Sequence, residues 1–450
     1  GIPTDSVGSR GNDTNYDGSI VVGWSEYLDG RWCPTIWENG GFERLNINGG
    51  ACMAEGISFD ENIVYGTSLD TTNNIVSATI WVRDGLGGWT EQILGHLPGT
   101  FNVDSGGHVT CNDISADNTI IATGGINGGV EKVREHWPGH WPEAPETILN
   151  GANPLSDGCL HDSAGQMGAR LTRLEDMWNY AAGVPHPQPH FDGHGLSLIP
   201  CKSALWLTPD GEPVGPAPMV TGYDTREMCR QVAAHPYTWQ VLNWKIAIKE
   251  LAVSGCDYMT AFRNKRKLEL VKQVLFGNKE LVNRLIDESE DFVVADTLPE
   301  LIDSMESMSL DGAILDREGM AADIAAYDAQ IARGPRYFND DQLRRIAAAR
   351  TYKADRLRTC AFQAIDDPRA RPLIAIREFI LSRKSLGGLQ TYLDCRVLGR
   401  SGEAMPGLYA VGEAAGFGGG GCSGKRSLEG HFLSSCVLTG RRAARAICNA

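Results

Sequence analysis

The sequence predicts a chain of two parts, an all-β repeat segment over residues 1–118 and a larger α/β region over residues 119–450. Three observations support this division. Short β-like units recur in the first part, strand and helix patterns alternate in the middle, and a strand, a glycine-rich loop and a helix follow one another near the end. A chain of 450 residues is long enough for two or three domains with large cores.

The first part contains an internal repeat. Residues 20–25, IVVGWS, return as residues 63–68, IVYGTS, and residues 35–37, TIW, return as residues 79–81. Short β-rich units with Gly, Asn and Asp turns at a period in the forties are typical of propeller blades or a similar array. The units resemble the HAF-type repeats of bacterial extracellular and autotransporter proteins. Two full units and part of a third are too few to close a propeller, so the array either packs on the downstream region or is a remnant.

Residues 407–430 are the most distinctive stretch of the α/β region. Residues 407–411 form a short apolar run typical of a buried strand, a Gly-Glu pair closes it, and four consecutive glycines follow at 418–421. Such glycines let a large flat ligand approach the backbone closely. An apolar pattern of helical period begins after Ser427, so the segment predicts a corner suited to anions. The alternative is a glycine-rich linker before a terminal helix.

The stretch from Pro406 to Ile447 resembles the C-terminal flavin-contacting segment of the FAD-dependent oxidoreductases related to fumarate reductase and ketosteroid dehydrogenase, within their bacterial FAD-binding dehydrogenase branch. The resemblance extends over residues 119–450. It implies an α/β flavoprotein-like region that consists of an incomplete Rossmann-type FAD domain plus an α+β cap. The implied ranges are a return into the FAD-domain-like region over 119–170, a cap or substrate domain over 171–375, and a C-terminal FAD-binding segment over 376–450.

The resemblance also implies FAD as the cofactor. In the family the Gly-Glu pair after the strand reaches the ribityl chain, and the next helix directs its N-terminus at the N1/O2 edge of the isoalloxazine. Reduced flavin is negative at that edge, and a helix N-terminus stabilises such charge by about 0.3–2 kcal/mol. The expected cofactor-binding residues are Thr123, Gly124, Gly125, Gly387, Gly388, Gly412, Glu413, Gly418, Gly419, Ser427 and Leu428.

A second candidate for chemistry is residues 381–393, LSRKSLGGLQTYL, in which Arg383 and Lys384 stand just before a Gly-Gly pair. In fumarate reductases a histidine pair precedes a similar Gly-Gly and contacts the substrate carboxylate. A fixed positive charge at this place polarises a carbonyl or holds a carboxylate. The alternative is a basic pair at a surface strand end. Arg426 lies within one residue of the family's substrate arginine, so the predicted catalytic residues are Arg383, Lys384 and Arg426.

The family's N-terminal strand and G-x-G-x-x-G turn are absent from this sequence. That turn seats the ADP pyrophosphate on a helix N-terminus, and neither residues 125–129 nor residues 85–88 have its context. The chain thus resembles a flavoenzyme whose first third is exchanged for β-repeats, which fits a natural fusion, a mispredicted frame or an assembly artefact. Its first residues, without an initiator Met or a leader pattern, are typical of a fragment or a processed product.

Composition excludes several classes of function. A formal net charge of −15 argues against a nucleic-acid-binding surface, and no apolar run approaches the length of a membrane span. The twelve cysteines show no CxxC or other metal spacing, so we expect buried thiols, no metal site and a reducing, cytoplasmic location.

The function expected from the sequence is an FAD-dependent dehydrogenase or reductase. It would transfer a hydride between flavin N5 and a CH–CH group next to a carbonyl of a small-molecule substrate. Without the ADP-binding turn much of the FAD affinity should be missing, which leaves an inactive protein open. The alternatives are a non-catalytic β-repeat binding module fused to a flavoprotein remnant, and a flavoenzyme whose FAD site is completed by another chain.

Overall fold

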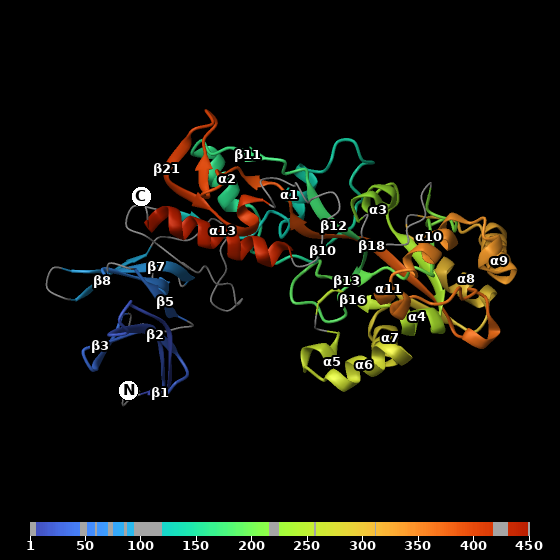
Figure 1. Ribbon diagram of the computed structural model, residues 1–450, viewed down its shortest axis with the longest axis horizontal. Coiled ribbons are helices and arrows are strands. Elements are labelled where there is room, and N and C mark those ends of the chain that lie inside the picture. Colours follow the sequence, from blue (N-terminus) through green and yellow to red (C-terminus); the bar gives the residue numbers. More distant parts are fainter. Residues whose placement is uncertain are drawn as a thin grey trace. The chain divides into compact units, whose positions relative to one another are not determined.

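The computed structural model describes residues 6–45, 52–58, 61–70, 75–84, 88–93, 119–215, 225–255, 258–310, 312–416 and 431–448. The chain forms two compact units (Figure 1). The first comprises residues 1–121, 404–410 and 443–450, and the second comprises residues 122–403 and 411–442. The expected mixture of β-rich and α/β structure is present.

The first unit begins with two four-stranded antiparallel sheets in which each strand pairs with the next along the chain. Seven buried residues from both sheets, among them Val22, Ile36, Val64 and Trp81, form one core. The repeated hydrophobic positions thus pack on each other, but an assignment to HAF-type repeats stays a prediction. The strands are β1 (Ser6–Thr14), β2 (Ile20–Tyr27), β3 (Trp32–Glu38), β4 (Gly41–Arg44), β5 (Met53–Ile57), β6 (Ile63–Asp70), β7 (Ile75–Arg83) and β8 (Trp89–Ile93).

The first unit also contains a parallel pair of strands that come from distant parts of the sequence. Strand β9 (Thr119–Ile121) pairs with β21 (Ala404–Ala410) in the register Tyr409↔Ile120. The strand expected at 407–411 is therefore β21. It begins earlier than the apolar run suggested, because extended pairing does not require apolar side chains at the end of a strand.

The second unit is organised around β18 (Leu373–Ser385), the longest strand of an eight-stranded sheet. Its first half is flanked by two antiparallel neighbours, and its second half pairs antiparallel with β12 and parallel with β10. The other strands of this unit are β10 (Ile148–Asn150), β11 (Leu171–Thr172), β12 (Met177–Pro185), β13 (Gly195–Ile199), β14 (Leu205–Leu207), β15 (Thr238–Asn243), β16 (Ala252–Val253), β17 (Phe292–Ala295), β19 (Gly388–Leu389) and β20 (Arg396–Leu398).

Helices surround this sheet, mostly within the range expected to form the cap (Figure 1). The Asp316 side chain caps α9 by accepting the Gly319 N–H, and the Asp340 side chain caps α10 by accepting the Leu343 N–H. The helices are α1 (Val130–Glu135), α2 (Cys159–Gln166), α3 (Thr225–Val232), α4 (Trp244–Glu250), α5 (Thr260–Arg263), α6 (Lys267–Phe276), α7 (Lys279–Glu288), α8 (Leu298–Ser307), α9 (Arg317–Arg333), α10 (Asp341–Ala349), α11 (Lys353–Arg358) and α13 (His431–Cys448), with 3-10 turns η3 (Pro335–Tyr337), η4 (Pro368–Ala370) and η5 (Gly412–Ala415).

One titratable side chain lies in the middle of the sheet. Glu378 of β18 is opposite Thr238 of β15 and is 1% exposed. Within the described residues neither of its carboxyl oxygens has a hydrogen-bond partner. Burial raises the pKa of Glu378 well above its ordinary value, because a charged carboxylate would lose its hydration without compensation.

Candidate functional site

The C-terminal end of β18 is the point where three segments of the second unit meet. Ser385 ends this strand, and its Oγ donates to Asn127 Oδ1 at 2.7 Å while accepting the Ile126 N–H at 2.7 Å. Its backbone N–H donates to Glu413 Oε1 at 2.8 Å. Ser385 therefore joins the turn after β9, the strand end and η5 into one corner, which we call the Ser385 corner (residues 125–127, 384–388 and 412–416).

Glycine is required at Gly125 because the corner is so tightly packed. A Cβ built on Gly125 would lie 2.3 Å from Ser385 Oγ and 2.7 Å from Glu413 Oε1. Both distances are below any normal contact. Asn127 closes the same turn from the other side, where its Nδ2 donates to Asn179 Oδ1 at 3.0 Å. The residues from 125 to 127 are thus fixed by the protein itself.

The expected Gly-Gly pair also lies at the corner, where it makes room for the chain's own backbone. A Cβ at Gly387 would lie 1.9 Å from the carbonyl oxygen of Arg173, and one at Gly388 would lie 2.5 Å from that of Ala414. The Gly387 N–H donates to the Asp176 carbonyl at 3.3 Å. The absence of side chains at 387 and 388 is therefore explained by protein packing alone.

Glu413 is partly buried, and only one of its two carboxyl oxygens accepts a hydrogen bond from a described residue. Its Oε1 accepts the Ser385 N–H, while no hydrogen bond joins Oε2 to any residue that the structure describes. Burial raises the pKa of Glu413, and the Ser385 N–H and the positive charges of Lys384 and Arg383 act against that rise. Glu413 thus offers one carboxyl oxygen for a further donor.

A buried histidine contacts the η5 part of the Ser385 corner. His161 of α2 is 1% exposed, and its Nε2 lies 3.0 Å from the carbonyl oxygen of Ala414 in η5. Because a carbonyl oxygen only accepts, Nε2 carries the proton and Nδ1 is the bare acceptor. Desolvation lowers the pKa of His161, which agrees with a neutral ring. His161 therefore positions η5 and is not available as a cation.

Arg383 and Lys384 lie near the end of β18, where the pairing with β12 shifts register between Leu381 and Lys384. Arg383 donates to the Gly151 carbonyl at 2.8 Å, and its guanidinium lies 5.8 Å from the ring centroid of Tyr180. Lys384 Nζ lies 4.3 Å from the ring centroid of Phe432 and 5.0 Å from that of Trp178, and these two rings stack at 5.4 Å. Such contacts favour a retained positive charge. Both members of the expected basic pair thus lie against aromatic rings, and Lys384 is the member that belongs to the corner.

The structure brings together six of the predicted site residues at or beside the corner, namely Lys384, Gly125, Gly387, Gly388, Gly412 and Glu413. Arg383 directly precedes the corner on β18, where it contacts the Gly151 carbonyl and the Tyr180 ring. Thr123 and Gly124 precede the corner on the turn after β9, where Thr123 is exposed and Gly124 has a φ of +81°. Arg426, Gly418, Gly419, Ser427 and Leu428 lie outside the described residues, so their roles stay predictions.

Sequence reasoning missed the polar residues that connect these segments. Ser385, Asn127 and Asn179 form a buried chain of hydrogen bonds, and Trp178 supplies a ring for Lys384. A serine directly after a basic pair and two residues before a Gly-Gly pair was the available sign, but single serines are common in surface loops. In the described part of the chain no group of His, Cys, Asp and Glu is arranged to hold a metal ion.

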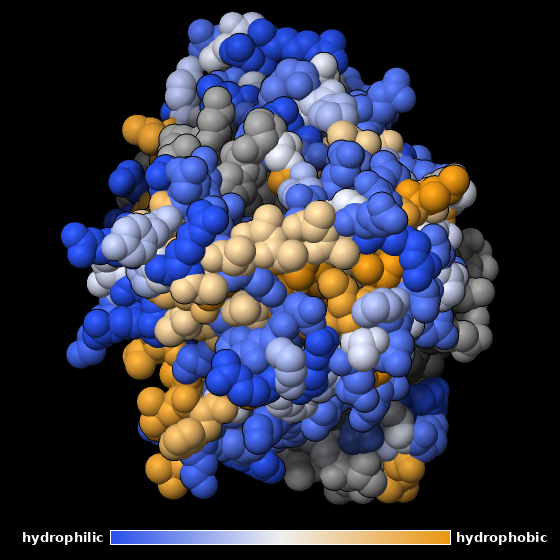
Figure 2. Space-filling view, turned by 90° about the vertical axis from the view of Figure 1, so that its right-hand side faces the viewer, coloured by the Kyte–Doolittle hydropathy of each residue, from blue (hydrophilic) through white to orange (hydrophobic). Residues whose placement is uncertain are grey.

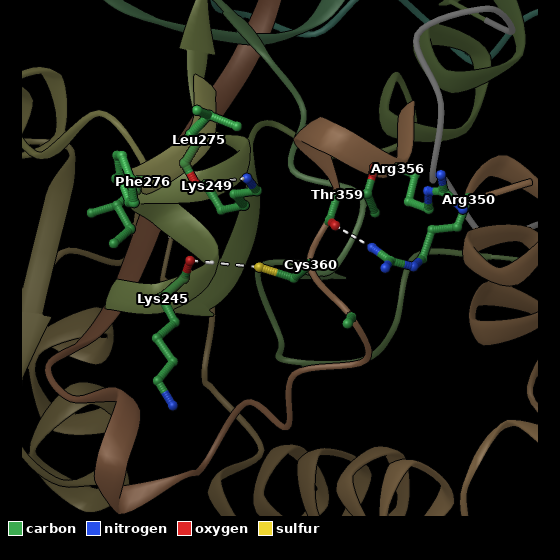
Figure 3. Close-up of a pocket in the computed structure, with 10 residues that line it drawn as sticks. Lys245, Lys249, Leu275, Phe276, Arg350, Arg356, Thr359 and Cys360 are labelled. Atoms are coloured by element: carbon green, nitrogen blue, oxygen red, sulfur yellow. Dashed lines mark hydrogen bonds between the residues drawn. The ribbon is translucent and has the colours of Figure 1, made fainter. Parts of the chain in front are cut away.

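A cavity of about 370 Å³ lies apart from these residues, in the cap. It is lined by Lys245, Ile248, Lys249, Leu275, Phe276, Arg350, Arg356, Thr359, Cys360 and Ala361 (Figure 3). None of them belongs to the Ser385 corner or was expected to bind the flavin or the substrate.

Comparisons with known proteins identify the family of the chain. A family model described as "FAD binding domain" matches residues 100–433. A KsdD-like steroid dehydrogenase of Mycobacterium tuberculosis is 40% identical over 337 residues, 74% of this chain and 59% of the relative. Its counterpart from Mycolicibacterium smegmatis is 39% identical over 326 residues, 71% of this chain and 58% of the relative. The chain thus spans less than two thirds of the length of these curated relatives.

A solved structure also shares the fold. The 3-ketosteroid Δ1-dehydrogenase of Sterolibacterium denitrificans, solved with 1,4-androstadiene-3,17-dione, is similar with a TM-score of 0.50 at 15% identity. The similarity covers 86% of this chain and 59% of that chain.

Proposed function

The chain belongs to the FAD binding domain family, and on this premise we propose that it is an FAD-dependent dehydrogenase or reductase acting on a CH–CH group next to a carbonyl. FAD, the cofactor expected from the sequence, is confirmed by the family match. A steroid is the first substrate class to test, because the curated relatives are KsdD-like steroid dehydrogenases. The observation that carries the proposal is the Ser385 corner, which includes Lys384.

The residues of the corner fit a flavin. Glu413 retains one oxygen, Oε2, without a partner among the described residues, and a carboxylate oxygen is a good acceptor for a ribityl hydroxyl. The turn at 125–127 and η5 are both fixed by Ser385, so the acceptor is held in place before any ligand arrives. Preorganisation of this kind lowers the entropy lost on binding.

FAD, when bound, would supply the acceptor for the hydride that leaves the carbon β to the carbonyl. The protein would then have to stabilise the negative charge that develops on the carbonyl oxygen when a base removes the proton from the carbon next to it. Lys384 suits this role, because its ammonium lies against Trp178 and Phe432, where less water screens its charge. Arg383, with its guanidinium bound to the Gly151 carbonyl, adds a second positive charge nearby. Arg426 remains the third proposed catalytic residue.

The first test is the visible absorption of the purified chain before and after it is mixed with FAD. We expect a shifted flavin spectrum and, with a 3-ketosteroid, bleaching of the flavin under anaerobic conditions. Lys384→Met should keep the spectrum and slow the bleaching by at least about a hundredfold, the usual loss when one group that stabilises an oxyanion is removed.

A parallel titration with FMN shows how much the adenosine half of FAD contributes to the binding affinity. FMN bound as tightly as FAD would mean that adenosine contacts contribute little in this chain, as expected without the G-x-G-x-x-G turn. Tighter binding of FAD only after a second protein is added would support an FAD site completed by another chain. The absence of any shift at high concentrations of both flavins would refute the proposal.

Substitution of Glu413 tests the corner itself. We expect Glu413→Ala to weaken FAD binding by about tenfold to a hundredfold, because it removes an acceptor and leaves the buried Ser385 N–H unpaired. Glu413→Gln keeps an oxygen for that N–H and should lose less. Equilibrium dialysis gives both constants, and equal affinities of the two variants would contradict the role of the carboxyl group. Circular dichroism of each variant checks that the loss is not caused by unfolding.

A further inference from the structure

Helix α6 has a largely apolar sequence, yet none of its side chains is buried. None of the ten residues of α6 is buried, although the helix sequence is KLELVKQVLF. The exposed fractions of Leu268, Val271, Leu275 and Phe276 are 82%, 55%, 53% and 74%. Phe262 of the preceding α5 is 63% exposed. Figure 2 shows a face of the molecule on which hydrophobic side chains gather in patches between hydrophilic ones.

The charged residues around these apolar side chains are predominantly basic. Residues 262–276 contain five basic residues, Arg263, Lys265, Arg266, Lys267 and Lys272, and one acidic residue, Glu269. Glu269 already pairs with Arg266 at 3.3 Å. The segment is therefore positive within a chain whose formal net charge is −15. We call Phe262, Leu268, Val271, Leu275 and Phe276 together with the five basic residues the α5–α6 surface.

The cavity of the cap is continuous with this surface, because Leu275 and Phe276 line both. Its charged lining residues are all basic, namely Lys245, Lys249, Arg350 and Arg356. Lys249 and Arg350 donate to backbone carbonyls, and Figure 3 shows Lys245 extending away from the other lining side chains. Arg356 has no ion-pair partner in the part of the chain that the structure describes. The cavity thus offers a positive recess beside an apolar helix.

We propose that the α5–α6 surface docks the protein on a lipid membrane with anionic headgroups, with the cavity beside it accepting a headgroup phosphate. Exposed Leu, Val and Phe side chains with basic residues around them are a common means by which a protein lies on such a membrane. The apolar residues enter the boundary between headgroups and acyl chains, and each nearby Lys or Arg adds attraction to the anionic lipids.

The charge pattern favours this occupant over another protein. The cores of protein interfaces are depleted of lysine, whereas three of the five basic residues of the α5–α6 surface are lysines. Because no residue of α6 is buried, its apolar side chains gain little from folding, and an external surface would stabilise them further. The proposal does not depend on flavin binding and can fail or hold independently of it.

Co-sedimentation with vesicles tests the proposal on the full chain. We expect binding to vesicles of phosphatidylcholine and phosphatidylglycerol in equal parts and little binding to phosphatidylcholine alone. Lys267→Glu with Lys272→Glu should weaken binding by at least tenfold, since each lost positive charge accounts for about fivefold. Leu268→Ser with Phe276→Ser should weaken it at least as much, and 0.5 M salt should reduce binding of the native chain.

Two matched variants serve as controls. Ile314 is 80% exposed and Arg336 is exposed, and both lie in the cap outside the α5–α6 surface, so Ile314→Ser and Arg336→Glu should bind vesicles like the native chain. Equal binding to both kinds of vesicle, or no loss in the Lys267/Lys272 variant, would overturn the proposal. A dimer in analytical ultracentrifugation that Leu268→Ser with Phe276→Ser dissociates, without vesicle binding, would assign the surface to a second copy instead.

Discussion

Gly387→Ala is expected to destabilise the second unit by about 3 kcal/mol, the upper range for overpacking of a closely fitted site. The added methyl group would lie 1.9 Å from the carbonyl oxygen of Arg173 and 2.2 Å from its carbonyl carbon. Both atoms belong to the backbone, so no side-chain rotation relieves the clash. The Leu386 N–H donates to the Asp176 carbonyl at 2.9 Å, which holds the two segments at this separation.

Urea unfolding followed by circular dichroism measures this loss. Gly139→Ala is the matched control, because a Cβ at Gly139 meets nothing within 4 Å and its φ does not favour glycine. A Gly387→Ala variant as stable as the control would mean that the corner tolerates more separation than its contacts indicate. Retained flavin binding in a destabilised variant would separate the packing role of this glycine from any role toward the cofactor.

Glu378 should make the stability of the native protein fall as the pH rises. A carboxyl group whose pKa is raised by folding contributes its full stability below its unfolded value and loses it as the pH approaches the folded pKa. The loss is about 1.4 kcal/mol per pH unit. Glu378→Gln removes this proton linkage. As the pH rises above 5, the variant should therefore gain stability relative to the native chain.

Unfolding curves of both proteins at several pH values provide the measurement. The two proteins are compared by how their free energies of unfolding change with pH. The amide of Gln introduces hydrogen-bond donors whose burial costs free energy, but this cost does not vary with pH. Glu318→Gln, at an exposed position of α9, controls for the loss of one carboxyl group. Parallel pH profiles of the native protein and Glu378→Gln would show that water or a neighbouring group stabilises the carboxylate inside the sheet.

The sequence predicted local elements better than the contacts between them. Helices α9 and α7 each begin directly after a side chain that caps them, Asp316 and Asn278, and Asp and Asn are residue types that a sequence marks as possible caps. The sequence does not distinguish Asn339 from Asp340 before α10, since both residue types accept the same backbone N–H, and Asp340 is the cap.

The candidate site could be predicted only in part. A glycine indicates a close approach but not the group that approaches. The backbone oxygens of Arg173 and Ala414 are the groups that an added Cβ at Gly387 and Gly388 would meet, and a role of these glycines toward the cofactor stays a prediction. The linkage of Ser385 to Asn127 spans 258 positions of sequence, and no local pattern reports such a contact.

The continuity of β18 limits how this protein can change its length during evolution. One uninterrupted strand leads from Leu373 in the cap to Ser385 at the corner. Insertion of a single residue between Phe379 and Lys384 would exchange the faces of every later side chain, so that Lys384 would leave the aromatic rings and Ser385 would leave Asn127. Gains and losses of residues should therefore accumulate in the segments that connect the elements of the second unit, while the spacing between Leu373 and the Ser385 corner stays constant.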